Sequence, residues 1–406
     1  MKKLLILPAV LLITLFMTHC TKESAEMDTG DKDGGYMELA DGFGSGLGTG
    51  GSSSGSGNGD TTQQVPVEPG QITAAEWNDL VNWDFWQNLG QNQEFNTASE
   101  NWKFYPENRY SFLIKDINQN PLVDCEVVLR NGKGDVVWKS RTDNEGMAEL
   151  WLNMNGQDDS GPVAIVSYSG QEVTVVDPFT IDHGINEVTM NAGQTGEMSA
   201  DILFVVDATG SMGDEIEYLK SELLDVISRV KDLNTLLDLR IGSVFYRDEG
   251  DEYLTRVSPF TSSLDQTLDF INAQRADGGG DYEEAVHTAL STAVTQLSWS
   301  EHARARLLFL VLDAPAHHTP PIVNDLNNTI RSTAEKGIKI IPVSASGINK
   351  DTEFLFRFFA VATNGTYVFI TNDSGIGGEH IEATVGDYEV ELLNDLIVRL
   401  ITKYTK

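Results

Sequence analysis

The second half of the sequence alternates short apolar runs with longer segments of helical periodicity. The first run covers residues 201–206, is almost wholly apolar and is rich in β-branched types, and it stops at Asp207. Such a run suits a strand buried on both faces of a parallel sheet. After a glycine-containing turn, apolar residues recur at spacings of three and four, which predicts a helix. These residues are Ile216, Leu219, Leu223, Ile227 and Val230.

The same alternation continues to the end of the chain. Regular alternation of strands and helices gives a mostly parallel sheet covered by helices on both faces, so we predict an α/β, doubly wound fold. We expect residues 196–406 to form this domain and to fold independently, since about 200 residues is a comfortable size for one core. The expected strands are Leu239–Tyr246, Leu307–Leu312, Ile338–Val343 and Tyr367–Ile370, with Tyr253–Val257 as an antiparallel edge strand. The expected helices lie near residues 264–275, 281–298, 322–336, 352–362 and 387–403.

Three alternate residues at the end of the first strand carry hard oxygen atoms: Asp207, Thr209 and Ser211. In open α/β sheets, ligands bind at the carboxyl ends of the strands. A carboxylate and two hydroxyls suit Mg²⁺, with Mn²⁺ or Ca²⁺ as alternatives, better than zinc or copper. The competing interpretation is an ordinary turn, because Asp, Thr, Gly and Ser are common turn residues.

The D-x-[ST]-x-S spacing resembles the metal-ion-dependent adhesion site (MIDAS) of von Willebrand factor type A (VWA) domains, and the resemblance extends over about residues 200–402. It implies a Rossmann-like domain whose remaining ligands come from two later loops. Asp313, which follows another apolar strand, stands where the family has its third-motif Asp. Asp281 stands where many relatives have Thr, so it either binds the ion, directly or through water, or is an acid favoured at a helix N-terminus.

The resemblance implies a binding protein and not an enzyme. The open coordination position of the ion would accept a carboxylate from a protein partner, as in adhesion-site domains. One alternative is an assembly scaffold with a purely structural ion. Another is a metal-dependent hydrolase using Ser211 or the pair His317 and His318. However, the nucleophile-elbow motif needs Gly at position 209, and adjacent loop histidines rarely converge on one ion.

The N-terminus predicts a lipid-anchored bacterial outer-membrane protein that faces the cell surface or the periplasm. Residues 1–19 have a charged start and a short apolar run, as in a secretory signal peptide. Cys20 directly follows and resembles the lipidated, palmitate-bearing cysteine of bacterial lipoproteins, although cleavage by an ordinary signal peptidase is the alternative. Residues 20–70 are rich in Gly, Ser and acids and predict a disordered tether.

The net charge of the chain excludes two classes of partner. It is −33, and removal of Lys2 and Lys3 with the signal peptide takes it to −35. Electrostatic binding to nucleic acid or to an anionic membrane surface is therefore excluded, and the lipid anchor must supply membrane attachment.

Two further segments precede the α/β domain. In residues 71–106, Thr73 and Glu76 form a capping-box pattern that predicts a helix, and its aromatic side chains either dock on the folded domains or present a surface for sugar or peptide. In residues 107–192 the period changes to two, with frequent turn signals, which predicts an antiparallel β-sandwich. This segment resembles carboxypeptidase-regulatory-like or transthyretin-like modules, which implies a spacer without chemistry. Cys125 lies in its apolar run and is expected to be a buried thiol.

Overall fold

The computed structural model describes residues 68–193, 199–233 and 237–406. The predicted signal peptide, Cys20 and nearly all of the predicted tether lie outside these residues and stay predictions. None of the helices described is both long enough and apolar enough to span a bilayer.

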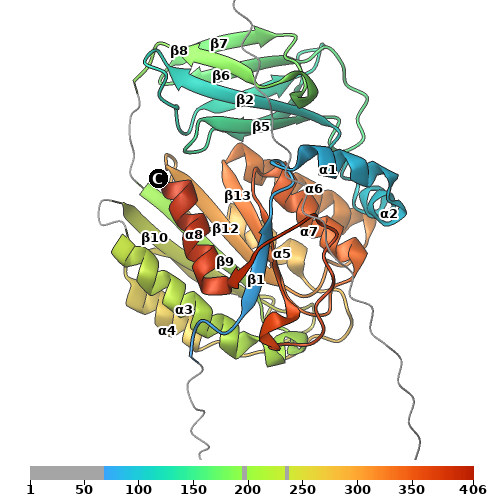
Figure 1. The fold of residues 1–406 in the computed structure, drawn as a ribbon, viewed down its shortest axis with the longest axis vertical. Coiled ribbons are helices and arrows are strands. Elements are labelled where there is room, and N and C mark those ends of the chain that lie inside the picture. The colour runs from blue at the N-terminus through green and yellow to red at the C-terminus, as the bar shows by residue number, and fades with distance from the viewer. Residues whose placement is uncertain (1–67, 194–198, 234–236) are drawn as a thin grey trace, which may run out of the picture. The chain divides into compact units, whose positions relative to one another are not determined.

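The C-terminal half is built on one eight-stranded sheet with the strand order β11-β10-β9-β12-β13-β14-β1-β15 (Figure 1). The five central strands run parallel, whereas β11 pairs with β10 in the antiparallel direction at one edge, as the sequence predicted. The predicted α/β fold class is therefore confirmed. The strands are β9 (Ser199–Asp207), β10 (Asp238–Tyr246), β11 (Thr255–Thr261), β12 (Ala305–Leu312), β13 (Ile338–Ser344), β14 (Tyr367–Ile370) and β15 (Val390–Leu392).

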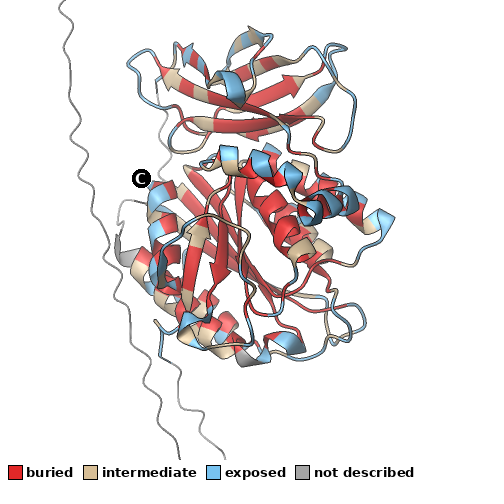
Figure 2. Ribbon diagram, turned by 45° about the vertical axis from the view of Figure 1, so that its right-hand side comes forward, coloured by how far each residue is buried: buried red, intermediate tan, exposed pale blue. Residues whose placement is uncertain are grey.

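Helices cover both faces of this sheet because successive strand residues point to opposite sides. In β9, Ile202 and Phe204 belong to one hydrophobic core, and Leu203 and Val205 belong to the other. The first core is closed by α3 (Ile216–Leu233), α4 (Leu264–Asn272) and α8 (Leu393–Thr405). The second is closed by α5 (Val286–Thr295), α6 (Pro320–Glu335) and α7 (Lys350–Ala362). Buried residues accordingly fill the strands, and exposed residues lie on the outer faces of the helices (Figure 2).

One strand of the sheet comes from far upstream, and it corrects a prediction. Residues Thr73–Trp77 form β1, not the start of a helix, and pair in the antiparallel direction with β14 on one side and with β15 on the other. The side chain of Ala74 enters one core and that of Ala75 the other. Long-range pairing on both edges outweighs the local helix signal here. A fragment of residues 196–406 would therefore lack a strand of its own sheet.

The aromatic helices that follow β1 dock on the α/β domain. They are α1 (Trp83–Asn88) and α2 (Gln93–Trp102). Phe95 is central to the contact, with ring centroids 5.1 Å from Trp86, 5.3 Å from Phe354 and 5.5 Å from Phe358. The docking interpretation of this segment is therefore confirmed, and these rings belong to the hydrophobic core.

Residues 108–190 form two small sheets around a shared core. One has the order β5-β2-β8 and the other β4-β3-β6-β7. Most pairs are antiparallel as expected, but β2 and β8 run parallel. Cys125 is buried, which confirms the prediction, and burial raises the pKa of its thiol to about 12. The strands are β2 (Asn108–Asp116), β3 (Glu126–Arg130), β4 (Val136–Arg141), β5 (Met147–Leu152), β6 (Val163–Tyr168), β7 (Gln171–Val176) and β8 (Asn186–Met190).

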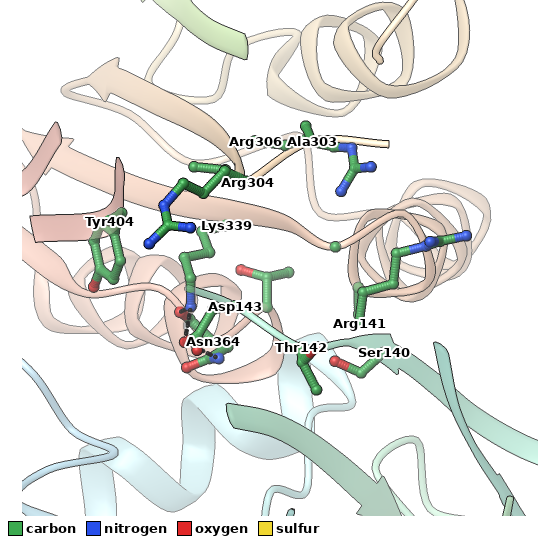
Figure 3. A pocket seen from close by; sticks show the side chains of 14 residues that line it. Ser140, Arg141, Thr142, Asp143, Ala303, Arg304, Arg306, Lys339, Asn364 and Tyr404 are labelled. Carbon is green, nitrogen blue, oxygen red and sulfur yellow. Dashed lines mark hydrogen bonds and ion pairs between the residues drawn. The ribbon is translucent and has the colours of Figure 1, made fainter. Parts of the chain in front are cut away.

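A small cavity of about 20 Å³ marks the junction between these sheets and the α/β domain (Figure 3). At its wall, Lys339 of β13 donates to Asp143 Oδ2 at 3.1 Å and to the carbonyl oxygen of Asn364 at 2.7 Å. Arg306, which also lines the cavity, donates to Asp124 Oδ1 at 2.9 Å. Ion pairs and hydrogen bonds thus help to hold the two parts together.

Candidate metal site

Four of the predicted ligands meet at the carboxyl edge of the sheet. Asp207 is the last residue of β9 and is fully buried. Its Oδ1 accepts hydrogen bonds from the Thr209 amide at 2.8 Å and the Thr209 hydroxyl at 2.7 Å, and Thr209 Oγ1 lies 3.1 Å from Ser211 Oγ. Ser211 in turn lowers the pKa of Asp313, which follows β12. The alternating spacing therefore brings together the oxygen atoms of Asp207, Thr209 and Ser211, and Asp313 lies near Ser211 at the end of the adjacent parallel strand.

Both carboxylates of this row are short of partners. Asp207 Oδ2 and Asp313 Oδ1 are buried, and neither has a hydrogen-bond partner among the described residues. The Tyr246 hydroxyl is near enough to lower the pKa of Asp207, but it does not reach hydrogen-bond geometry with Oδ2. An unpaired buried carboxylate is costly unless a cation neutralises it. The donor set of carboxylate and hydroxyl oxygens fits a hard divalent cation such as Mg²⁺.

Sequence reasoning left one acidic residue of this edge unassigned. Glu284 lies three positions after Asp281 and is only 2% exposed, and in the part of the chain that the structure describes its Oε2 has no hydrogen-bond partner. A Cβ placed on Gly279 would be 3.0 Å from Glu284 Oε1 and 3.5 Å from Thr209 Cβ, so the glycine allows this close approach. The signal available in the sequence was the run of acids before a helix, but it did not show which acid turns inward.

Asp281 lies in a different group from the other predicted ligands. One of its carboxylate oxygens, one of Asp248 and one His317 nitrogen lie within 4.8 Å of one another. The assignment of Asp281 as a ligand of the ion at Asp207 and Asp313 stays a prediction. His317 and His318 diverge, as expected: His317 Nε2 is 2.7 Å from Asp248 Oδ1, whereas His318 Nε2 is 3.0 Å from the carbonyl oxygen of Asn101.

The pKa values of the three inward-facing acids are all raised. Burial is the main cause in each case, and it raises the pKa of Asp207 to about 6 against the opposing hydrogen bonds from Thr209. Burial and the neighbouring charge of Asp207 raise the pKa of Asp313 to about 7 and that of Glu284 to about 9. This group of three buried acids thus favours a bound positive charge, either protons or a metal ion.

These shifts predict how stability depends on pH without metal. A folded-state pKa above the unfolded value means that the native state binds more protons, so the free energy of unfolding falls as pH rises. For Asp313, the free energy of unfolding should begin to fall above pH 4 and continue to fall through about pH 7. The total decrease should be a few kcal/mol at most. Urea unfolding in chelator at pH 5, 6.5 and 8 checks this, with Asp313→Asn as the comparison. The variant should lose less stability over this range than the wild type, and equal losses would contradict the prediction.

Comparison with known proteins agrees with this architecture. Residues 201–375 match the family model described as von Willebrand factor A domain. An ariadne-like RING finger protein of Acanthamoeba polyphaga mimivirus is 33% identical over 118 residues, which are 29% of this chain and 11% of that protein. The alpha-protein kinase vwkA of Dictyostelium discoideum is 32% identical over 170 residues, which are 41% of this chain and 26% of that protein. The chain thus spans about a quarter or less of these relatives.

Two solved structures also align with about half of the chain. One is the conserved hypothetical protein BatB from Bacteroides thetaiotaomicron, with 14% identity, a TM-score of 0.36, and coverage of 50% of this chain and 98% of that one. The other is an aerotolerance-related membrane protein from Bacteroides fragilis, with 14% identity, a TM-score of 0.34, and coverage of 51% and 98%.

Proposed function

We propose that this chain, which contains a von Willebrand factor A domain, is a lipid-anchored binding protein of the bacterial cell envelope and not an enzyme. In this proposal the domain binds one divalent cation, Mg²⁺ in the first place, and recognises a protein partner through it. The match to this family supports a general role in protein interaction or adhesion. The pair of buried, unpartnered carboxylate oxygens on Asp207 and Asp313 carries the more specific proposal.

The chemistry of the site suggests which group the partner presents. Asp207, Thr209, Ser211 and Asp313 would hold the ion, with Glu284 as a further acid beside them. Glu284 is protonated near neutral pH because its pKa is raised to about 9, so the carboxylates of Asp207 and Asp313 would balance the charge of a divalent ion. The two hydroxyls are neutral, and the open coordination position would accept one more hard oxygen ligand. Ser211 is exposed, so the ion would be reached from the outside at this residue. A carboxylate of the partner is the group that best completes such a coordination sphere.

The net charge of −33 opposes the approach of an acidic partner at long range. Salt screens this repulsion beyond roughly 8 Å, whereas the ion acts at contact. Recognition is therefore expected to depend on the ion and to become stronger with moderate salt, which distinguishes it from binding through a complementary charged surface.

A pull-down from envelope extracts tests the proposal. The full-length chain should retain its partner in MgCl₂ and release it in chelator, and Asp313→Ala should behave in MgCl₂ as the wild type does in chelator. Esterification of the partner's carboxylates should also abolish capture. Capture that is insensitive to chelator and to Asp313→Ala would instead favour a scaffold with a structural ion.

Membrane attachment has its own test. Cys20→Ala is expected to abolish lipid labelling and to release the protein from the membrane fraction, because each buried CH₂ of an acyl chain contributes about 0.8 kcal/mol to membrane binding. Cys125→Ala is the matched control, since that thiol is buried in the fold. Retention of Cys20→Ala in the membrane fraction would show that another segment supplies the anchor.

A further inference from the structure

A second group of metal-ligating side chains lies beside the first. It consists of Asp248, Asp281 and His317, which come from three separate loops. Asp248 follows β10, Asp281 precedes α5, and His317 follows β12. One ligand atom from each lies within 4.8 Å of the other two, close enough for a single ion to reach all three. Glu283 Oε2 lies 3.6 Å from His317 Nδ1 and adds a fourth polar group at the rim.

The buried side chain of Glu284 is an independent sign that a cation belongs here. Its residue is only 2% exposed, and no hydrogen bond from any described residue reaches its buried Oε2. Its amide donates to the carbonyl oxygen of Pro315 at 2.9 Å, and it bridges with Ala316, so its backbone runs next to His317. After burial, the charges that most raise its pKa are those of Asp207 and Asp248. Glu284 therefore lies near one acid of each group.

Acidic side chains are crowded at this edge. Asp207, Asp313 and Glu284 form the first group, and Asp248 and Asp281 form a second group beside His317. The nearby Arg247 guanidinium is turned to other groups. It donates to the carbonyl oxygens of Ala208 at 3.1 Å and Arg275 at 2.8 Å. Among the described residues, its ion pairs are with Glu252 at 3.9 Å and Asp277 at 3.7 Å.

We propose that Asp248, Asp281 and His317 form a second cation site, distinct from the one formed by Asp207 and Asp313. One imidazole nitrogen and two carboxylate oxygens suit a first-row transition ion such as Mn²⁺ or Zn²⁺, whereas the all-oxygen first site suits Mg²⁺. The ion would replace the hydrogen bond between His317 Nε2 and Asp248 Oδ1. The second site depends on its own residues and does not rest on the proposed recognition of a partner.

Titration of Co²⁺ into the purified full-length chain tests this site, because its visible absorption reports the ligand set directly. Mg²⁺ is kept in excess so that it occupies the first site. We expect one Co²⁺ to bind, and we expect His317→Gln to weaken binding at least about 10-fold, as losses at metal sites generally do. Asp281→Asn should also weaken binding. Because the Asp281 side chain is exposed, this variant should fold normally, so the weaker binding would report the loss of a ligand. His318→Gln is the matched control and should bind like the wild type.

The two sites can fail separately. Asp207→Ala should lose Mg²⁺ binding and keep the Co²⁺ spectrum, so loss of the first site leaves the second measurable. Co²⁺ binding of equal affinity and spectrum in wild type, His317→Gln and Asp281→Asn would overturn the second site. So would loss of Co²⁺ binding in His318→Gln to the same extent as in His317→Gln.

Discussion

An Arg357→Met variant is expected to be less stable than the wild type by about 3–5 kcal/mol. Arg357 lies on α7 and is fully buried. Its Nη2 lies 2.6 Å from Asp79 Oδ1, its Nε 3.0 Å from Asp79 Oδ2, and its Nη1 3.3 Å from Glu353 Oε1. Removing the guanidinium leaves the buried carboxylate of Asp79 without its cation, and leaves that of Glu353 with Lys350, whose Nζ lies 2.9 Å from Glu353 Oε2. It also removes the ion pair that holds the segment after β1 against α7.

Urea unfolding of the full-length chain measures this loss, and Arg399→Met is the matched control. Arg399 also joins the N-terminal segment to the α/β domain, through Glu76 at 2.8 Å, but its side chain is 46% exposed. Exposed pairs contribute only up to about 1 kcal/mol, so this variant should remain close to the wild type. A double variant, Arg357→Met with Asp79→Asn, should recover part of the loss. Equal destabilisation by the two single variants would contradict the assigned role of the buried pair.

This buried pair also shows where prediction from the sequence ends. Periodicity predicted the parallel strands, and the resemblance to von Willebrand factor type A domains implied in advance that Asp207 and Asp313 belong to one site. Asp79 and Arg357 are 278 positions apart, and no local pattern joins them. Strand β1 was missed for the same reason: its residues carry a helix-capping signal, and only its pairing with β14 and β15 makes it a strand.

The loop before α5 is a part of the site that the sequence could not predict. Residues 281–284 contain three acids, and the sequence indicates only that they precede a helix. The structure turns Glu284 inward and leaves Asp281 exposed beside His317. Which acid turns inward depends on the bridge between Glu284 and Ala316, and hence on a neighbouring loop from another part of the chain.

The second large effect is expected at Asp207. Asp207→Ala should abolish binding of the divalent ion at the first site and, with it, capture of the partner. The substitution removes a buried carboxylate whose Oδ2 has no partner among the residues that the structure describes, so the metal-free domain should stay folded and lose little stability. Asp207→Asn should have the same effect on the ion while keeping an oxygen that accepts from Thr209. Asp277→Ala, in a loop residue whose side chain is 81% exposed, should leave binding unchanged.

The most direct test is calorimetric titration of Mg²⁺ and Mn²⁺ into the full-length wild type, Asp207→Ala and Asp277→Ala. His317→Gln provides the background, so that only the first site is measured. The proposed site predicts one ion bound by the wild type and by Asp277→Ala, and no measurable binding by a folded Asp207→Ala. Equal affinity in wild type and Asp207→Ala would contradict the assignment of the site and, with it, recognition of a partner through the ion.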